Sequence, residues 1–162
     1  MERHAIAYGF STTVALPHAE TLRLTKAALA AEGFGVLCET DMEAMLRMKI
    51  GADVGPYVML AACNPSLANA AVGLDRDIGL LLPCNVVVYA ARDASRTVVS
   101  VIDPERLFSL AEAHGLLPIA SDATARLLRT LRAIEQFVPP VVAPATSPLR
   151  PNGADTTIEE IC

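Results

Sequence analysis

Residues 57–74 read YVMLAACNPSLANAAVGL, and this stretch decides the fold. Its first seven residues are all apolar apart from the tyrosine hydroxyl, and they predict a strand over 57–63. Asn64 suits the N-cap of a helix, and Pro65 suits its first turn, where the missing N–H would be unpaired in any case. We therefore expect a strand that passes directly into a helix ending near residue 74.

The residues before this stretch predict two further strand and helix pairs. Strands are expected over 6–14 and 34–40, where β-branched or alternating apolar residues occur. Helices are expected over 19–32, with Gly33 placed to terminate the first of them, and over 42–50. The N-terminal half of the chain is therefore predicted to alternate strands with helices.

Two valine-rich runs follow, over 80–90 and 97–102, and a polar loop separates them as in a β-hairpin. Asp103 is expected to open a helix that closes near His114. Ser121 or Asp122 then opens a last helix that reaches Phe137. The complete order of elements is βαβαβαββαα.

Composition limits the class of protein. With 162 residues, of which 52% are apolar, the chain is long enough for one domain, which we place at residues 6–138. Five prolines between Pro139 and Pro151 mark residues 139–162 as a flexible, proline-rich tail. A net charge of −5 and only 4% aromatic residues argue against nucleic acid as a partner.

The cellular location is predicted from the absence of recognisable targeting signals in the sequence. No uninterrupted apolar segment of a secretory signal follows Met1, so a cytoplasmic protein is expected. Residues 54–74 carry no charge, but two prolines and two asparagines interrupt them, and no membrane span is predicted.

Two matched tripeptides are the candidate site: Cys63-Asn64-Pro65 and Pro83-Cys84-Asn85. Each places a thiol beside a carboxamide where an apolar run ends or begins. If the strands that carry them are neighbours, the two thiols and two carboxamides line one pocket. The simpler interpretation is that both cysteines are buried core residues, since free cysteine is among the most buried residue types.

Other candidate residues give weaker signals. Lys49, in the last turn of the 42–50 helix, either faces an anionic ligand or only complements the helix dipole. Met42, Met45 and Met48 share one side of that helix, where thioethers suit Cu(I), but an apolar stripe packed on the sheet is the preferred interpretation. The four cysteines show no paired CxxC spacing, so no metal site is predicted and no cofactor is assigned.

Three segments together resemble the domain-of-unknown-function family 302: EGFGVLCETDM, YVMLAACNPSLANAA and IGLLLPCNVVVY. The resemblance covers about residues 8 to 135. It implies a single compact α+β domain with a mainly antiparallel sheet packed against helices, in an arrangement similar to that of the TATA-binding protein. It also implies a homodimer, and it implies no reaction, substrate or cofactor.

Three functions are compatible with these observations. The preferred one is a non-enzymatic, dimeric module that binds a small ligand in a pocket of Cys63, Asn64, Cys84, Asn85 and Lys49. The second is a thiol enzyme or sulfur carrier in which Cys63, placed before a helix N-terminus that favours a thiolate, acts with Cys84. The third is a structural homodimer without a small-molecule site.

Overall fold

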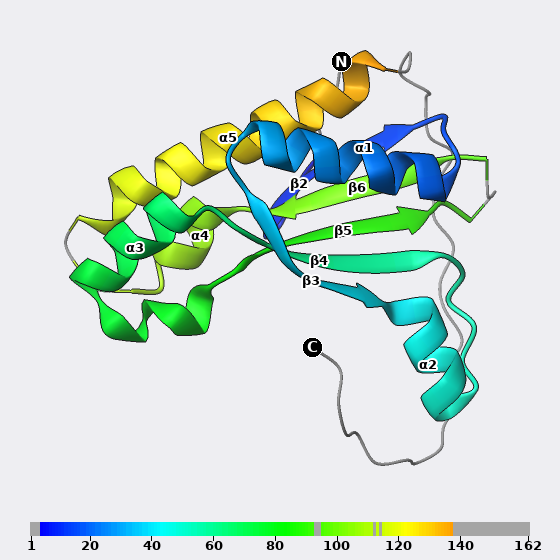
Figure 1. Ribbon diagram of the computed structural model, residues 1–162, viewed down its shortest axis with the longest axis horizontal. Coiled ribbons are helices and arrows are strands. Elements are labelled where there is room, and N and C mark those ends of the chain that lie inside the picture. Colours follow the sequence, from blue (N-terminus) through cyan, green and yellow to red (C-terminus); the bar gives the residue numbers. More distant parts are fainter. Residues whose placement is uncertain (1–3, 93–94, 112, 114, 138–162) are drawn as a thin grey trace.

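One antiparallel sheet of six strands forms the centre of the molecule (Figure 1). The computed structural model describes residues 4–92, 95–111, 113 and 115–137. Side by side, the strands are β1 (His4–Ile6), β2 (Gly9–Val14), β6 (Thr97–Ile102), β5 (Cys84–Ala90), β4 (Tyr57–Cys63) and β3 (Gly35–Asp41). The expected α+β class with an antiparallel sheet and helices is confirmed.

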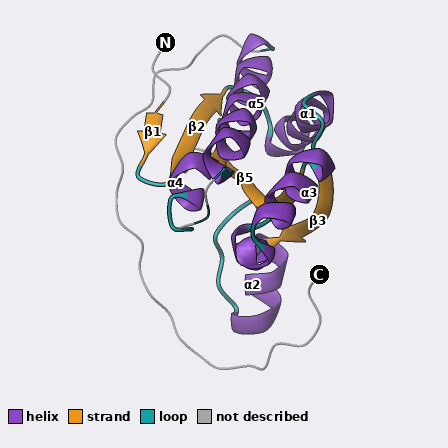
Figure 2. Ribbon diagram, turned by 90° about the vertical axis from the view of Figure 1, so that its left-hand side faces the viewer, coloured by secondary structure: helices purple, strands orange, loops and turns teal. Residues whose placement is uncertain are grey.

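The helices lie on one face of this sheet and at its two ends. They are α1 (His18–Ala31), α2 (Met42–Ile50), α3 (Pro65–Leu74), the short 3₁₀ helix η1 (Arg76–Leu81), α4 (Pro104–Phe108) and α5 (Leu116–Gln136). The long helices α1 and α5 pack on each other, and both pack on strands of the sheet. The elements α3, η1 and α4 gather at one end, seen head-on in Figure 2, and α2 lies at the other.

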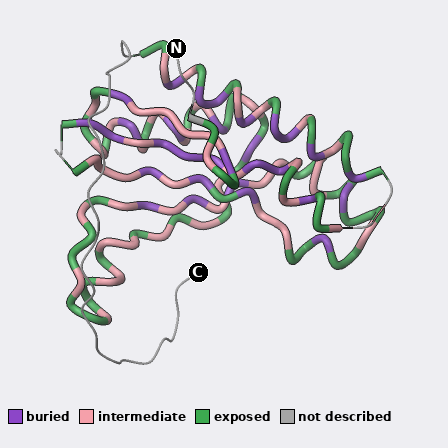
Figure 3. The backbone as a smooth tube through the Cα atoms, turned by 180° about the vertical axis from the view of Figure 1, so that it is seen from behind, coloured by how far each residue is buried: buried purple, intermediate pink, exposed green. Residues whose placement is uncertain are grey.

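The main core lies between the sheet and the helices α1 and α5. Along β4 the residues alternate between buried and half-buried, as the two-residue period of a strand requires (Figure 3). Leu60 pairs with Val86, which pairs with Val101, so one row of buried side chains crosses three strands. Leu29 of α1 and Leu131 of α5 cover this layer and are fully buried.

A second, smaller cluster closes the end of the molecule where α3, η1 and α4 meet α5. Ile78 of η1, Phe108 of α4 and Leu116 of α5 are its largest buried members. This cluster matters for the candidate site, because it fixes the short helices against the ends of β4 and β5.

Side-chain caps place the helix starts where the sequence predicts them. The carboxylate of Asp41 accepts a hydrogen bond from the N–H of Ala44 at 2.9 Å, and this bond starts α2. Asp103 accepts from the N–H of Glu105 at 3.0 Å and starts α4 in the same way. Gly33 follows the end of α1 and terminates the helix, as expected. Its φ of 82° lies in the left-handed region.

The single strand expected over residues 6–14 is wrong, because the chain forms a hairpin there. Ile6 pairs with Gly9, so β1 folds back on β2. Two hydrogen bonds hold the turn: Asp103 donates its N–H to the carbonyl of Tyr8 at 3.0 Å, and Arg106 donates to the carbonyl of Ala7 at 2.7 Å. These contacts come from residues about a hundred positions away, which local patterns do not reveal.

Three other boundaries differ from prediction. The helix that Asp103 opens ends at Phe108 and does not continue to about residue 114. The apolar run over 80–90 begins as the 3₁₀ helix η1, and the strand starts only at Cys84. The last helix begins at Leu116, after Gly115 in the left-handed region, so Ser121 and Asp122 lie inside it. A short apolar run fits a buried helix turn as well as a strand, and only packing distinguishes them.

The methionine stripe of α2 packs on the sheet only in part: α2 contacts β3 and β4, and Met42 and Met45 are half-buried. Helix α2 has no buried residue, and the side chain of Met48 is 71% exposed. The reason is that Asp41 is both the last residue of β3 and the N-cap of α2, so the helix extends beyond the sheet (Figure 1). The tail expected over 139–162 and His114 lie outside the described residues.

The packing of the core predicts that Leu131→Ala strongly lowers the free energy of unfolding. This side chain is fully buried between α5 and the sheet, and its truncation should cost about 2–5 kcal/mol of the free energy of unfolding. Urea unfolding measures the loss. Leu117→Ala, on the same helix but 66% exposed, is the control and should cost about 0.5 kcal/mol or less. Equal losses in the two variants would contradict the assigned packing.

Candidate functional site

The two free cysteines of the described chain lie at the same end of two neighbouring strands. Cys63 is the last residue of β4, and Cys84 is the first residue of β5. Because the strands are antiparallel and Ala62 pairs with Cys84, the end of one strand lies beside the start of the other. The sheet register therefore brings together two motifs that are separate in the sequence.

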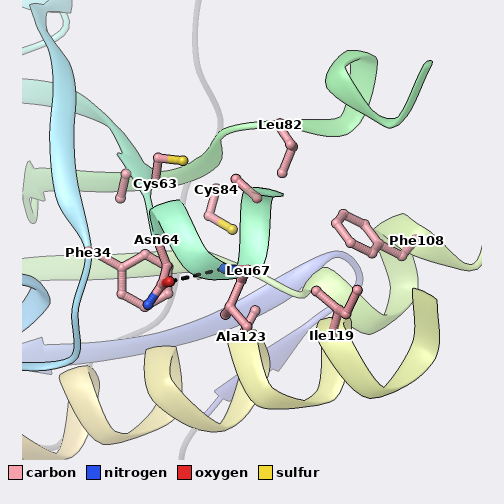
Figure 4. A pocket seen from close by; sticks show the side chains of 11 residues that line it. Phe34, Cys63, Asn64, Leu67, Leu82, Cys84, Phe108, Ile119 and Ala123 are labelled. Carbon is pink, nitrogen blue, oxygen red and sulfur yellow. Dashed lines mark hydrogen bonds between the residues drawn. The ribbon is translucent and has the colours of Figure 1, made fainter. Parts of the chain in front are cut away.

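Cys63 and Cys84 are both among the residues that line one small pocket, and their side chains lie on opposite faces of the sheet (Figure 4). Cys84 shares the buried face with its partner Ala62, and Cys63, the neighbour of Ala62, points the other way. The remaining wall is almost entirely apolar and includes Phe34, Leu82 and Phe108. The free space amounts to about 20 Å³, which is about what one water molecule needs. No lining residue is charged, and none is a histidine.

Asn64 also lines the pocket, but its carboxamide is occupied by the helix start. Its Oδ1 accepts a hydrogen bond from the N–H of Leu67 at 3.2 Å and caps α3, as the sequence predicts. The amide nitrogen lies against Gly33, where an added Cβ would come within 2.9 Å of it. Asn64 therefore stabilises the junction of α1, β4 and α3, and its side-chain oxygen is not available to a ligand.

The other two candidate residues are elsewhere. Asn85 follows Cys84 on β5, is exposed and points to the opposite face of the sheet, because neighbouring strand residues alternate. Lys49 lies on α2, and it does not line the pocket. Of the five candidates, the structure thus brings together Cys63, Asn64 and Cys84. Ligand binding by these residues stays a prediction.

The pocket keeps both thiols protonated. Burial raises the pKa of Cys63 above its ordinary value. Burial, together with the neighbouring Cys63, raises the pKa of Cys84 to about 11. The sequence suggested that the helix N-terminus after Cys63 would favour a thiolate, and the direction is the opposite. Asn64 already satisfies one of the free N–H groups of that helix start, and the apolar wall penalises charge.

The apolar wall of the pocket could not be predicted from the sequence. Phe34 follows the end of α1, Leu82 follows η1, Phe108 ends α4 and Ile119 belongs to α5, so four distant segments contribute. Each of these residues also looks like an ordinary core residue in the sequence. Their meeting depends on the second hydrophobic cluster, for which no local motif exists.

The structure also bears on metal binding and on membrane insertion. In the described ranges, no three side chains of His, Cys, Asp or Glu gather closely enough to hold a metal ion. None of the helices in the described part of the chain is both long and apolar enough to cross a bilayer.

The raised pKa of Cys84 predicts how stability depends on alkaline pH. The unfolded thiol loses its proton near pH 8.5, whereas the folded one retains it to about pH 11, so this contribution to stability is complete below pH 8.5 and is lost as pH rises to 11. By pH 10.5 the loss reaches up to about 3 kcal/mol. Urea unfolding at pH 8 and pH 10.5 should show a smaller alkaline loss for Cys84→Ala than for the wild type.

Two partly buried tyrosines provide the internal control for this experiment. Burial also raises the pKa of Tyr57 and of Tyr89, but both proteins contain them, so their effect cancels in the comparison. An equal alkaline loss in wild type and variant would show that Cys84 is not held as a buried thiol.

Comparison with known proteins identifies the family but no activity. The family model described as domain of unknown function DUF302 matches residues 10–134. A crystal structure of an uncharacterized conserved DUF302 protein from Bacillus stearothermophilus is 29% identical, with a TM-score of 0.73, and the match covers 80% of this chain and 99% of that one. No curated protein matches. The chain belongs to the DUF302 family, as its paired cysteine-asparagine motifs indicate.

Proposed function

We propose that the protein is a non-enzymatic module that binds a small ligand between Cys63 and Cys84. One observation carries this proposal: Cys63 and Cys84, the free cysteines of the described chain, are both among the residues that line one apolar pocket. A concave apolar site with a few convergent polar groups is the usual form of a binding site. Cys63 and Cys84 form such a polar pair at the junction of β4, α3 and β5.

The chemistry of the pocket favours binding over catalysis. A cysteine nucleophile needs a lowered pKa and a base or cation beside it, as catalytic thiols have. Here burial raises the pKa of both thiols, and the lining contains no charged group and no histidine. The alternative of a thiol enzyme or sulfur carrier therefore loses the feature that suggested it.

The homodimer is a second proposal, and it is supported by the face of the sheet that no described helix covers, called here the uncovered face. The side chains of Tyr57, Met59, Val87 and Tyr89 alternate with the core residues and are only partly buried. Tyr57 and Tyr89 stack with their ring centres 5.4 Å apart. The outward positions of β4, β5 and β6 carry no charge, so two copies with a net charge of −5 each can meet there without direct repulsion.

Location in the cytoplasm is kept as part of this proposal. The unpaired thiols of Cys63 and Cys84 fit a reducing compartment, whereas Cys38 is disulfide-bonded.

Native mass spectrometry tests the ligand proposal. Protein purified under reducing, oxygen-free conditions should carry one small excess mass relative to the denatured chain. The double variant Cys63→Ala/Cys84→Ala should lose this mass. Asn85→Ala, an exposed position just outside the pocket, is the matched control and should retain it. An excess mass in all three proteins, or in none, would contradict the proposal.

Light scattering after size exclusion tests the dimer. The wild type should show twice the 17.1 kDa mass of the chain, and Val87→Lys should shift it to the monomer, because a charge placed on the uncovered face would be buried without a partner. Val72→Lys, on α3 and 39% exposed, should remain dimeric. A monomeric wild type at micromolar concentration would remove this proposal and leave the pocket unaffected.

A further inference from the structure

Cys38 differs from the two cysteines of the pocket, because it is disulfide-bonded. The chain contains four cysteines, at positions 38, 63, 84 and 162, and Cys63 and Cys84 are free. A partner for Cys38 within the same chain can therefore only be Cys162. Cys162 lies outside the described residues, so this pairing follows from the count of cysteines alone.

A β-bulge decides which face of the sheet Cys38 occupies. Val36 pairs with Ala62, which is fully buried under the helices, and two residues later a regular strand would return to that face. The register shifts between Val36 and Cys38, however, and Cys38 pairs with Ala61. An extra residue of this kind re-aims the side chains that follow it. The bulge therefore turns Cys38 to the uncovered face.

Contacts of the next two residues agree with this orientation. The carboxylate of Glu39 accepts a hydrogen bond from Nζ of Lys26 on α1 at 2.8 Å, so Glu39 lies on the helix side of the sheet. Thr40, which shares the face of Cys38, places its hydroxyl oxygen 3.5 Å from the Cys38 sulfur. Cys38 is thus a half-buried residue on the uncovered face of β3, an edge strand of the sheet.

The residues that follow α5 are long enough to reach Cys38. Residues 138–162 span at most about 80–90 Å when extended. The whole of α5, with its 21 residues, is only about 30 Å long. Because α5 packs on the helix side of the sheet, a link to Cys38 brings the end of the chain around to the uncovered face.

We propose that Cys38 and Cys162 form a redox-sensitive disulfide that anchors the C-terminal segment at the uncovered face, where it excludes a second copy of the chain. The part that concerns the second copy rests on the proposed homodimer. Thr40 pairs with Met59, and Met59 pairs with Val87, so the anchor lies beside the residues assigned to the dimer contact. The same surface cannot hold both the segment and a partner.

The redox state of the surroundings controls this disulfide. Exposed disulfides are the labile ones, and those of cytosolic proteins are mostly redox-sensing or catalytic. On closing, Cys38 and Cys162 each lose the hydrogen of their S–H group and one S–S bond forms. A small oxidised disulfide such as glutathione disulfide takes up these two hydrogens and becomes two thiols. Opening is the reverse reaction, with a small thiol as the reductant.

Peptide mapping under non-reducing conditions tests the pairing on the full chain. The protein is equilibrated with oxidised or with reduced glutathione, its free thiols are alkylated in denaturant, and the digest is analysed by mass spectrometry. The oxidised wild type should yield a fragment that joins Cys38 to Cys162. The reduced protein and the Cys162→Ser variant should lack it.

Cys63→Ser is the control for the map, because it removes a free thiol and should leave the linked fragment in place. Absence of the fragment from the oxidised wild type, or a link from Cys38 to Cys63 or Cys84, would overturn the pairing.

Light scattering on the same samples tests the consequence for the dimer. The reduced wild type should show twice the 17.1 kDa mass of the chain, and the oxidised wild type should fall to the mass of one chain. The double variant Cys38→Ser/Cys162→Ser should remain dimeric in both conditions. An oxidised wild type that contains the link and is still dimeric would overturn the competition for the face.

Failure of this inference is distinguishable from failure of the proposed homodimer. A wild type that is dimeric in both conditions and lacks the link would remove the anchor and leave the homodimer. A wild type that is monomeric in both conditions and contains the link would remove the homodimer, and with it the competition, and leave the anchor.

Discussion

The antiparallel pairing of β4 with β5 is the constraint on which the rest of the structure depends. With Leu60 opposite Val86 and Ala62 opposite Cys84, the buried faces of the two strands coincide, and a shift of one strand by one residue would turn its buried side chains to the other face of the sheet. The same register fixes the end of β4 beside the start of β5. The pocket is therefore a consequence of the packing that stabilises the sheet.

Chemistry at this junction follows from what surrounds the thiols. Four apolar segments close over them and supply neither a cation nor a base, so burial dominates their titration and holds them in the neutral form. Such a site is poorly suited to nucleophilic attack, because a cysteine nucleophile needs a lowered pKa. The small free volume also restricts the size of a ligand.

Much of this fold could be predicted because the sequence signals that start and end its helices are local. Asp41 and Asn64 cap helices through hydrogen bonds to residues three positions on, and Gly33 ends one by its left-handed backbone. The hairpin at Tyr8 and the start of the last helix could not be predicted, because contacts with distant residues decide them. The candidate site divides in the same way: its sulfur atoms were visible in the motifs, and its apolar wall was not.

The central claim is that the register of β4 and β5 holds Cys84 as a buried thiol in the apolar pocket. The most direct measurement follows the reaction of each free cysteine with iodoacetamide in the native and in the unfolded protein, by mass spectrometry of the digested chain. The account predicts that Cys84 reacts only after unfolding. Reaction of Cys84 in the native protein at the rate seen in the unfolded protein would contradict it.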